Sequence, residues 1–222
     1  MNFRHEWKHE ISWGDVLALR ARLSAVMEPD PHGIKGRYRI RSLYFDNLED
    51  RALREKLDGV DGREKFRLRT YNGDPSLVLL EKKLKRGGLC AKAQERLDPE
   101  NVDALCRNRP EELTARTPLL LDLRNKMASQ GLAPKTIVDY TREAFLFSPG
   151  NVRVTLDYGL RTSLNCQGFL DPDRATLPAK NAPAILEVKW DQFLPCLIRD
   201  LVQIPGARTG AFSKYAACRI YG

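Results

Sequence analysis

The stretch from residue 63 to residue 86 reads REKFRLRTYNGDPSLVLLEKKLKR, and it decides the fold. In a strand, side chains two positions apart share a face. Arg67 and Arg69 therefore lie on one face of a first strand, while Phe66 and Leu68 lie on the other. An NGDP turn divides the stretch, and a second alternating segment follows it. The stretch predicts a β-hairpin with one charged face and one apolar face.

Strand and helix patterns continue along the rest of the chain without an internal repeat or a long linker. Apolar residues at helical spacing and capping residues such as Ser12 and Thr117 indicate the helices. Further strands are predicted at residues 3–11, 37–46, 89–97, 135–147, 152–162 and 184–190, and helices at 12–27, 47–58, 117–131, 195–203 and 212–219, with another beginning at 98–99. Many antiparallel strands with a few covering helices are typical of an α+β protein built on an antiparallel β-barrel. We expect one domain over residues 1–222.

The chain carries a surplus of positive charge. Its 222 residues include 37 Lys or Arg against 29 Asp or Glu, a formal net charge of +8. Such a surplus suggests an anionic partner, which could be nucleic acid, a membrane surface or a phosphorylated small molecule. No stretch approaches the ~18 apolar residues that span a bilayer, and the charged N-terminus is unlike a signal peptide. We therefore expect a soluble, cytoplasmic protein.

Two familiar kinds of site are not indicated. The five cysteines are scattered and form no Cys-x-x-Cys pair, which argues against a disulfide framework or a zinc site. No Walker phosphate-loop motif occurs in the chain.

The charged strand faces have two interpretations. Arginine dominates several strands, and a Glu-x-Lys pair occurs three times, at Glu6/Lys8, Glu81/Lys83 and Glu187/Lys189. In a single strand, such a face is ordinarily exposed to solvent. If the strands instead close with their apolar faces outward under the helices, the charged faces line the interior. Like charges at low dielectric repel, so this arrangement requires a bound polyanion, and carboxylates beside its phosphates would be ligands for Mg²⁺ or Mn²⁺.

Seven short motifs follow one another along the chain: RSLYFD (41–46), KFRLRTY (65–71), LEKK (80–83), YTREAF (140–145), RVTLD (153–157), LEVK (186–189) and SKY (213–215). Each is weak alone, but their order is specific. Together they resemble the VTC domain, the polyphosphate polymerase module of the vacuolar transporter chaperone complex and its bacterial relatives, which belongs to the triphosphate tunnel metalloenzymes. The resemblance covers nearly the whole chain and implies an antiparallel β-barrel, the triphosphate tunnel, with flanking helices.

The resemblance also implies roles for individual residues. The catalytic set would be Lys8, Arg67, Arg69, Lys83 and Glu187, with Glu187 as the metal ligand. Phosphate would also be bound by Arg142, Arg153, Lys189 and Lys214, together with Arg39 or Arg41, and Tyr140 falls beside the site. The first strand departs from the family pattern, because it reads HEWKH where related tunnel enzymes carry Glu-x-Glu-x-Lys. This departure leaves the role of Glu6 in metal binding open, and the resemblance does not decide that of Asp157 either.

The implied activity is an ATP-dependent polyphosphate polymerase that transfers the γ-phosphoryl group of ATP to phosphate or polyphosphate, with Mn²⁺ or Mg²⁺ as cofactor. Its expected partners are ATP, polyphosphate and pyrophosphate, with no nucleic acid and no membrane segment in the chain. Two alternatives stay open. One is a metal-dependent hydrolase of tripolyphosphate or nucleoside triphosphates on the same fold, and the other is a non-catalytic module that binds polyphosphate or RNA ends.

Overall fold

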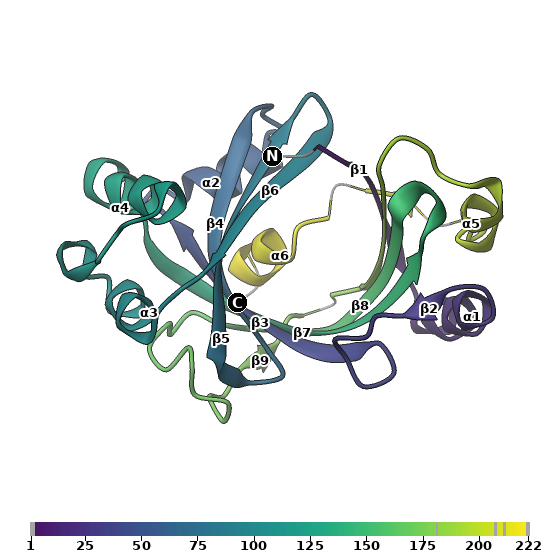
Figure 1. Cartoon of the computed structure of the whole chain (residues 1–222), viewed down its shortest axis with the longest axis horizontal. Coiled ribbons are helices and arrows are strands. Elements are labelled where there is room, and N and C mark those ends of the chain that lie inside the picture. Colours follow the sequence, from purple (N-terminus) through teal and green to yellow (C-terminus); the bar gives the residue numbers. More distant parts are fainter. Residues whose placement is uncertain (1–2, 181, 207, 211, 221–222) are drawn as a thin grey trace.

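In the part of the chain that the structure describes, an antiparallel sheet of eleven strands curls around a central space (Figure 1). The computed structural model describes residues 3–180, 182–206, 208–210 and 212–220. The sheet runs in the order β11-β1-β10-β8-β7-β3-β4-β5-β6, and β2 pairs with β7 while β9 pairs with β8. The strand bounds are β1 His5–Ile11, β2 Glu28–Pro29, β3 Arg37–Asp46, β4 Arg63–Tyr71, β5 Asp74–Arg86, β6 Leu89–Arg96, β7 Ala133–Phe147, β8 Val152–Ser163, β9 Leu177–Pro178, β10 Ala184–Trp190 and β11 Arg208–Thr209.

The edges of the sheet meet at one point. Arg4, just before β1, and Cys90 in β6 form an isolated antiparallel bridge. The Arg4 N–H donates to the Cys90 carbonyl at 3.0 Å, and the Cys90 N–H donates to the Arg4 carbonyl at 3.2 Å. This bridge brings the curled sheet close to a barrel, and the predicted α+β fold is confirmed.

Two pairs of helices cover the outer apolar face of the sheet (Figure 1). The described helices are α1 Trp13–Ser24, α2 Arg51–Leu57, α3 Pro99–Cys106, α4 Pro118–Gln130, α5 Cys196–Leu201 and α6 Lys214–Ile220. Over β4 and β5, Phe66 and Leu68 pack with Leu105 and Leu123 from α3 and α4. Under α1 and α5, an equivalent cluster covers β8 and β10. None of these helices combines the length and the apolar character needed to cross a membrane.

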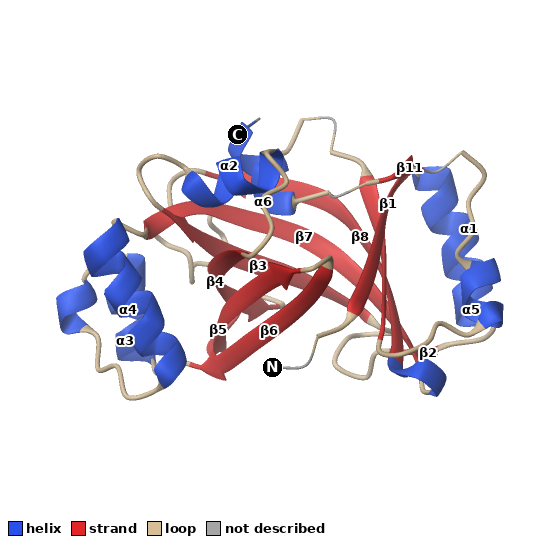
Figure 2. Cartoon of the chain, turned by 90° about the horizontal axis from the view of Figure 1, so that it is seen from above, coloured by secondary structure: helices blue, strands red, loops and turns tan. Residues whose placement is uncertain are grey.

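The remaining two helices, α2 and α6, lie together beside the central space (Figure 2). One carboxylate, that of Asp46 at the end of β3, ties them to each other. It accepts hydrogen bonds from the N–H groups of Ala52 and Leu53 at 2.9 and 3.1 Å. It also accepts one from the Tyr215 hydroxyl at 2.7 Å. Because Tyr215 is fixed in this way, its neighbour Lys214 is held at the central space.

Most predicted element bounds agree with the structure. Strands 37–46, 63–71 and 184–190 have the predicted bounds, and the Ser12 side chain caps α1 by accepting from the Asp15 N–H at 3.2 Å. The helix ends at Ser24, not near Met27 as predicted, because Glu28 and Pro29 leave it to pair with β7.

Candidate functional site

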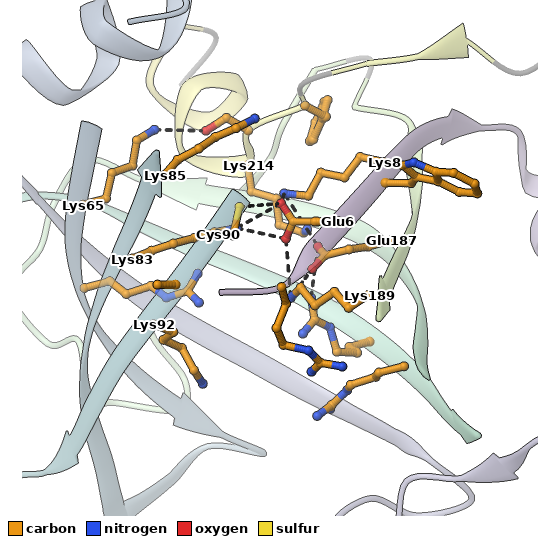
Figure 3. A pocket seen from close by; sticks show the side chains of 18 of the residues that line it. Glu6, Lys8, Lys65, Lys83, Lys85, Cys90, Lys92, Glu187, Lys189 and Lys214 are labelled. Atoms are coloured by element: carbon orange, nitrogen blue, oxygen red, sulfur yellow. Dashed lines mark hydrogen bonds and ion pairs between the residues drawn. The ribbon is translucent and has the colours of Figure 1, made fainter. Parts of the chain in front are cut away.

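The inward face of the sheet surrounds a cavity of about 840 Å³ (Figure 3). Among the described residues that line it, fourteen are Lys or Arg and two are Glu. The alternate side chains of the same strands point outward into the apolar clusters under the helices, so strand alternation sends the charge inward. So many like charges at low dielectric repel one another unless anions offset them.

Two glutamates, Glu6 of β1 and Glu187 of β10, lie among these cations on neighbouring strands. The Lys8 ammonium joins them, since its Nζ is 3.0 Å from Glu6 Oε2 and 3.8 Å from Glu187 Oε2. Lys189 also pairs with both carboxylates. Burial raises the pKa of each glutamate, but the surrounding cations outweigh burial. They lower the pKa of Glu6 to about 2 and hold that of Glu187 well below its usual range, so both are ionised at neutral pH.

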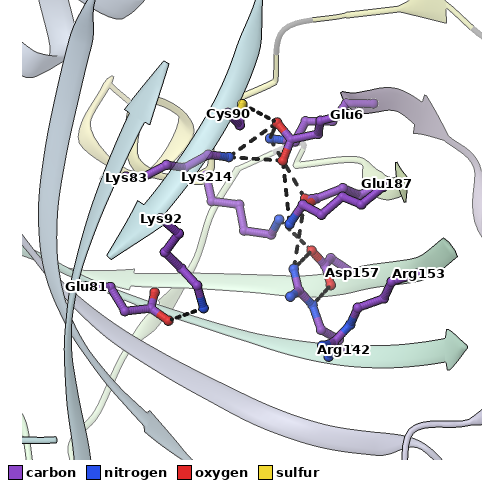
Figure 4. A network of polar contacts seen from close by, with 12 residues as sticks. Glu6, Glu81, Lys83, Cys90, Lys92, Arg142, Arg153, Asp157, Glu187 and Lys214 are labelled. Atoms are coloured by element: carbon purple, nitrogen blue, oxygen red, sulfur yellow. Dashed lines mark hydrogen bonds and ion pairs between the residues drawn. The ribbon is translucent and has the colours of Figure 1, made fainter. Parts of the chain in front are cut away.

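A third carboxylate, Asp157 of β8, is buried beside this pair (Figure 4). Arg142 donates to it from Nε at 2.6 Å and from Nη2 at 2.7 Å. Lys214 of α6 places its Nζ 2.6 Å from Oδ2 of the same carboxylate, the oxygen that Arg142 Nη2 also contacts. Burial raises the pKa of Asp157, but these two cations outweigh it and lower the pKa to about 2. Asp157 thus fixes one cation from β7 and one from α6 at the cavity wall.

Glu81 of β5 does the same for three other cations. Arg67 Nε donates to its carboxylate at 2.7 Å, Lys92 Nζ donates at 3.2 Å, and Arg69 Nη1 lies 3.7 Å away. Burial raises the pKa of Glu81, but the two arginines and Lys92 hold it below its usual range. The carboxylate is almost completely shielded from solvent, so it orients these cations without facing a ligand itself.

Three guanidinium groups, those of Arg4, Arg69 and Arg153, keep a buried Nε–H that makes no hydrogen bond among the described residues. Arg4 Nε is 2.6 Å from an oxygen of Asp191, so its charge is compensated there, whereas Arg69 Nε and Arg153 Nε have no such neighbour. Leaving a buried donor unsatisfied costs ~1–3 kcal/mol. Guanidinium groups match phosphate oxygens in geometry and charge. A phosphate in the cavity would therefore satisfy donors that the protein alone does not.

The cavity gathers most of the residues that the sequence analysis assigned to the site. It is lined by ten of the twelve, namely Lys8, Arg67, Arg69, Lys83, Tyr140, Arg142, Arg153, Glu187, Lys189 and Lys214. They come from six strands and α6 and are far apart in the sequence. The strand residues among them share the inward orientation that strand alternation predicts, and Lys214 reaches the cavity from α6.

The other two, Arg39 and Arg41, do not line the cavity. Arg41 is buried on the other face of β3, where its Nε and Nη2 each donate to Asp139 at 2.9 Å. Arg39 is exposed. The inward positions of β3 are instead occupied by tyrosines, Tyr38 and Tyr44. The expectation that Arg39 or Arg41 binds phosphate is corrected accordingly, because β3 turns its arginines away from the cavity.

Sequence reasoning left out several cavity residues. Lys65 and Lys85 continue the inward alternation of β4 and β5, so the strand period could have found them. Lys92 lies in β6, where charged residues occur on both faces and alternation gives no direction. Lys56 reaches the cavity from α2, and no motif in the sequence indicates this.

Comparison with protein families identifies the kind of domain. The model of the VTC domain matches residues 3–220. The chain belongs to the VTC domain family. The resemblance inferred from the seven motifs is thereby confirmed. No curated protein matches the chain.

Solved structures share the fold of this VTC domain. The PH1819 protein from Pyrococcus horikoshii has a TM-score of 0.53 and 13% identity, and the match covers 96% of this chain and 96% of that one. The PH1012 protein from the same organism has a TM-score of 0.53 and 12% identity, with 95% and 96% covered. At such low identity the likeness concerns the fold alone.

The VTC resemblance implies a divalent metal. Within the described part of the chain, no three His, Cys, Asp or Glu side chains gather into a preformed metal site. Mg²⁺ at a phosphate site needs less, because it binds through one or two carboxylates plus the substrate's own phosphates. Glu6 and Glu187 meet this requirement, since both are ionised, adjacent and at the cavity. A metal there would share these carboxylates with Lys8 and Lys189.

Proposed function

We propose that this VTC domain is an ATP-dependent polyphosphate polymerase. It transfers the γ-phosphoryl group of ATP to inorganic phosphate or to the end of a polyphosphate chain and releases ADP. The observation that carries the proposal is the charge of the cavity, with fourteen cations against two glutamates, in a chain of the VTC family. A linear polyphosphate supplies the dense negative charge that such a cavity lacks.

The arginines are proposed to hold phosphate oxygens. Glu81 orients Arg67 and Arg69, and Arg69 also has an unpartnered Nε. Arg153, with its own unpartnered Nε, would act in the same way, and Arg142 is held at the cavity wall by Asp157. Fixed guanidinium groups suit phosphoryl transfer, because the protein catalyses this reaction by positioning the reactants and neutralising their charge. It does not need to form a covalent bond to the phosphoryl group.

The lysines are proposed to neutralise the non-bridging oxygens as the phosphoryl group moves. Lys8, Lys83 and Lys189 surround the two glutamates, and Lys214 approaches from α6. Tyr140 lies among them, with the Lys214 ammonium 4.7 Å from its ring centre. The acceptor is itself a phosphate oxygen, so the reaction requires no activated Ser, Cys or His.

Glu187, with Glu6 beside it, is proposed to hold Mn²⁺ or Mg²⁺ together with substrate phosphates. When bound, the metal supplies positive charge that offsets the negative charge of the phosphates. The role of the protein is then to keep both carboxylates ionised, which the neighbouring lysines do by lowering their pKa.

One experiment separates this proposal from its alternatives. The protein is incubated with ATP and Mn²⁺, and the products are resolved by ³¹P NMR. Signals from chain-internal phosphates support the polymerase. Orthophosphate without such signals would identify a triphosphate hydrolase, and unchanged ATP with measurable binding would identify a non-catalytic binding module.

The proposed partners are ATP and polyphosphate or pyrophosphate. The cytoplasmic location and the single domain over residues 1–222 stay predictions.

A further inference from the structure

A second cavity, of about 720 Å³, lies on the outer side of the sheet, where α1 stands beside β3 and β7. The strand residues that line it are Arg37, Arg39, Thr141, Glu143 and Phe145, and they alternate with residues that face the central cavity. One wall comes from α1, which lies outside the curled sheet (Figure 1). We call this cavity the outer groove. Its volume is within the range of ligand-binding clefts, and the proposed reaction does not use it.

One buried carboxylate, that of Glu143, holds two guanidinium groups at the outer groove. Arg20 donates to it from Nε at 2.7 Å and from Nη2 at 2.8 Å, and Arg37 donates from Nη2 at 2.8 Å. Burial raises the pKa of Glu143, but hydrogen bonds from Arg20 and Tyr158 and the charges of both arginines outweigh burial and lower it. Glu143 therefore stays ionised and fixes both guanidinium groups in place. Neither uses its Nη1 in a hydrogen bond within the described part of the chain.

The outer groove carries more positive charge than its own carboxylate offsets. Four cations line it, Arg20, Lys35, Arg37 and Arg39, against the single carboxylate of Glu143, which leaves a surplus of three positive charges. Lys35 and Arg39 are exposed and pair with no carboxylate among the described residues. The outer groove is thus complementary in charge to an acidic ligand.

A tight turn at residues 34–37 forms the rim of the outer groove. Ile34 and Arg37 exchange backbone hydrogen bonds of 3.1 and 3.0 Å. Lys35 and Gly36 at the tip of the turn have positive φ angles of 52° and 73°, as a type I′ turn requires. The turn holds Ile34 at the groove with 84% of its surface exposed.

Further apolar side chains on α1 extend the outer groove. Trp13 and Leu17 are 55% and 49% exposed. They share one side of the helix with Arg20, because residues three and four positions apart lie on the same helix face. Trp13 packs edge-on against Tyr158 with ring centres 5.0 Å apart, and the Tyr158 hydroxyl donates to Glu143. The apolar stripe of α1 therefore continues directly from the basic part of the groove.

We propose that the outer groove is a docking site for an acidic segment of a partner protein, with an apolar side chain of that segment beside Ile34 or Leu17. The guanidinium groups of Arg20 and Arg37 pair with its carboxylates, which arginine binds with well-defined geometry. This inference is independent of the proposed polymerase activity.

Three other occupants match the outer groove less closely. A bilayer surface is flat and does not fill a concave groove. A nucleic acid backbone offers Ile34 and Leu17 no apolar contact. A second copy of this chain carries the same formal net charge of +8, so two copies repel each other.

The test selects random peptides displayed on phage against the wild-type protein and two variants. The groove variant is Arg39→Glu with Leu17→Glu, which reverses one charge and removes apolar surface at exposed positions. The matched control is Arg199→Glu with Leu197→Glu, which makes the same changes at exposed positions of α5 outside the groove. Peptides retained by the wild type and the control but not by the groove variant are expected to combine Asp or Glu with Leu, Ile or Phe. A synthetic peptide of that sequence should bind the groove variant about tenfold more weakly than the wild type.

Tripolyphosphate affinity is measured on the same preparations and should be equal in all three, because neither variant alters a residue that lines the central cavity. Equal melting temperatures show that the variants fold, and Arg39→Glu alone replaces the groove variant if it does not. The inference is overturned if no peptide distinguishes the wild type from the groove variant, or if the selected peptides lack acidic residues. It is also overturned if the groove variant instead abolishes binding to vesicles of anionic lipid, binding to single-stranded RNA, or dimerisation of the wild type.

Discussion

Arg142 and Asp157 stand directly opposite each other on the paired strands β7 and β8, and they form a two-pronged ion pair with N–O distances of 2.6 and 2.7 Å. The same carboxylate also holds Lys214. Asp157 therefore holds two cavity cations in place while it is itself shielded from solvent. Its contribution to stability can thus be measured apart from the binding of a ligand by those cations.

We predict that Asp157→Asn destabilises the free protein but leaves it responsive to anions. Removing one partner of a buried ion pair costs ~3–5 kcal/mol, because the other charges stay buried without compensation. Tripolyphosphate should recover part of the lost free energy of unfolding, because it can pair with Arg142 and Lys214 once they have lost the Asp157 carboxylate. Denaturant unfolding with and without tripolyphosphate measures both effects. Asp191→Asn, at an exposed ion pair with Arg4, is the control and should change little. A loss for Asp157→Asn that tripolyphosphate does not reduce would contradict the prediction.

Glu187→Gln is predicted to abolish turnover while triphosphate binding stays intact or tightens. The change removes a negative charge from a cationic cavity, which does not weaken its attraction for a polyanion. It also removes a charged oxygen ligand, so the metal is held poorly. Steady-state turnover and calorimetric affinity are measured on the same preparation. Near-normal turnover at saturating metal would show that Glu187 serves only as the structural partner of Lys8 and Lys189.

Arg69→Ala is predicted to weaken binding itself. A charge-assisted hydrogen bond contributes ~1.5–3 kcal/mol, so the dissociation constant for tripolyphosphate should rise about tenfold to a hundredfold. Arg39→Ala is the matched control, because Arg39 is exposed and does not line the cavity. Calorimetric titration of both variants decides the matter. Comparable losses in the two would mean that binding follows net charge and not the cavity.

The pH dependence of binding is expected to follow Lys65. Burial, reinforced by Lys56 and Arg63, lowers its pKa to about 7, so above this value the free protein holds it mostly neutral. A bound polyanion favours the ammonium form and raises the pKa. Affinity should therefore fall as the pH rises above about 7, and binding should take up a proton. Lys83, with a pKa of about 8, adds a second step.

Lys65→Gln should remove the fall in affinity near pH 7. Protonation of the ligand affects wild type and variant equally, so it cancels when their pH profiles are compared. The stability of the free protein has the opposite sign. The unfolded chain keeps the Lys65 proton up to a pKa of 10.5, whereas the folded chain loses it near 7, so this group makes the free energy of unfolding rise with pH across that window. Identical pH profiles for wild type and Lys65→Gln would exclude Lys65 as the titrating group.

Tripolyphosphate is predicted to raise the melting temperature more than equimolar orthophosphate or sulfate does. A ligand that binds only the folded state stabilises it by ~2.7 kcal/mol at a hundredfold excess over its dissociation constant. A linear triphosphate can reach several cavity cations at once, whereas a single tetrahedral anion reaches fewer. Thermal scans at matched ionic strength provide the measurement, and equal shifts from all three anions would indicate screening alone.

The sequence predicts the site best where a strand has one apolar and one charged face. In β4, Phe66 and Leu68 pack under helices, and this forces Arg67 and Arg69 inward. The strand β3 is different, because it is buried on both faces from Ile40 onward. Arg41 satisfies its charge on Asp139 away from the cavity, a pairing between residues 98 positions apart that no local pattern encodes.

Two further contributions, from Lys56 and Glu81, depend on tertiary contacts that the sequence does not show. Lys56 belongs to α2, and its place at the cavity depends on how Asp46 caps that helix and holds Tyr215 of α6. Glu81 was recognised as part of a charged face, but its role as the buried partner of Arg67 and Lys92 needs the pairing of β5 with both neighbours. Such tertiary relations set the details that alternation leaves undetermined.

The Arg4–Cys90 bridge closes the wall of the cavity at a single isolated pair of residues, whereas the other neighbouring strands pair along continuous ladders. We call this line of closure the seam. There, Arg4 and Cys90 of β6 share two backbone hydrogen bonds, and Glu6 of β1 forms an ion pair with Lys83 of β5 at 3.0 Å. Each such hydrogen bond contributes only ~0.5–1.5 kcal/mol net, so the closure at the seam is less stable than the long ladders elsewhere in the sheet. An anion that binds Lys83 in place of Glu6 removes the ion pair between β1 and β5 at the seam. Binding an anion in the cavity and closing the wall of the cavity therefore compete for the same lysine.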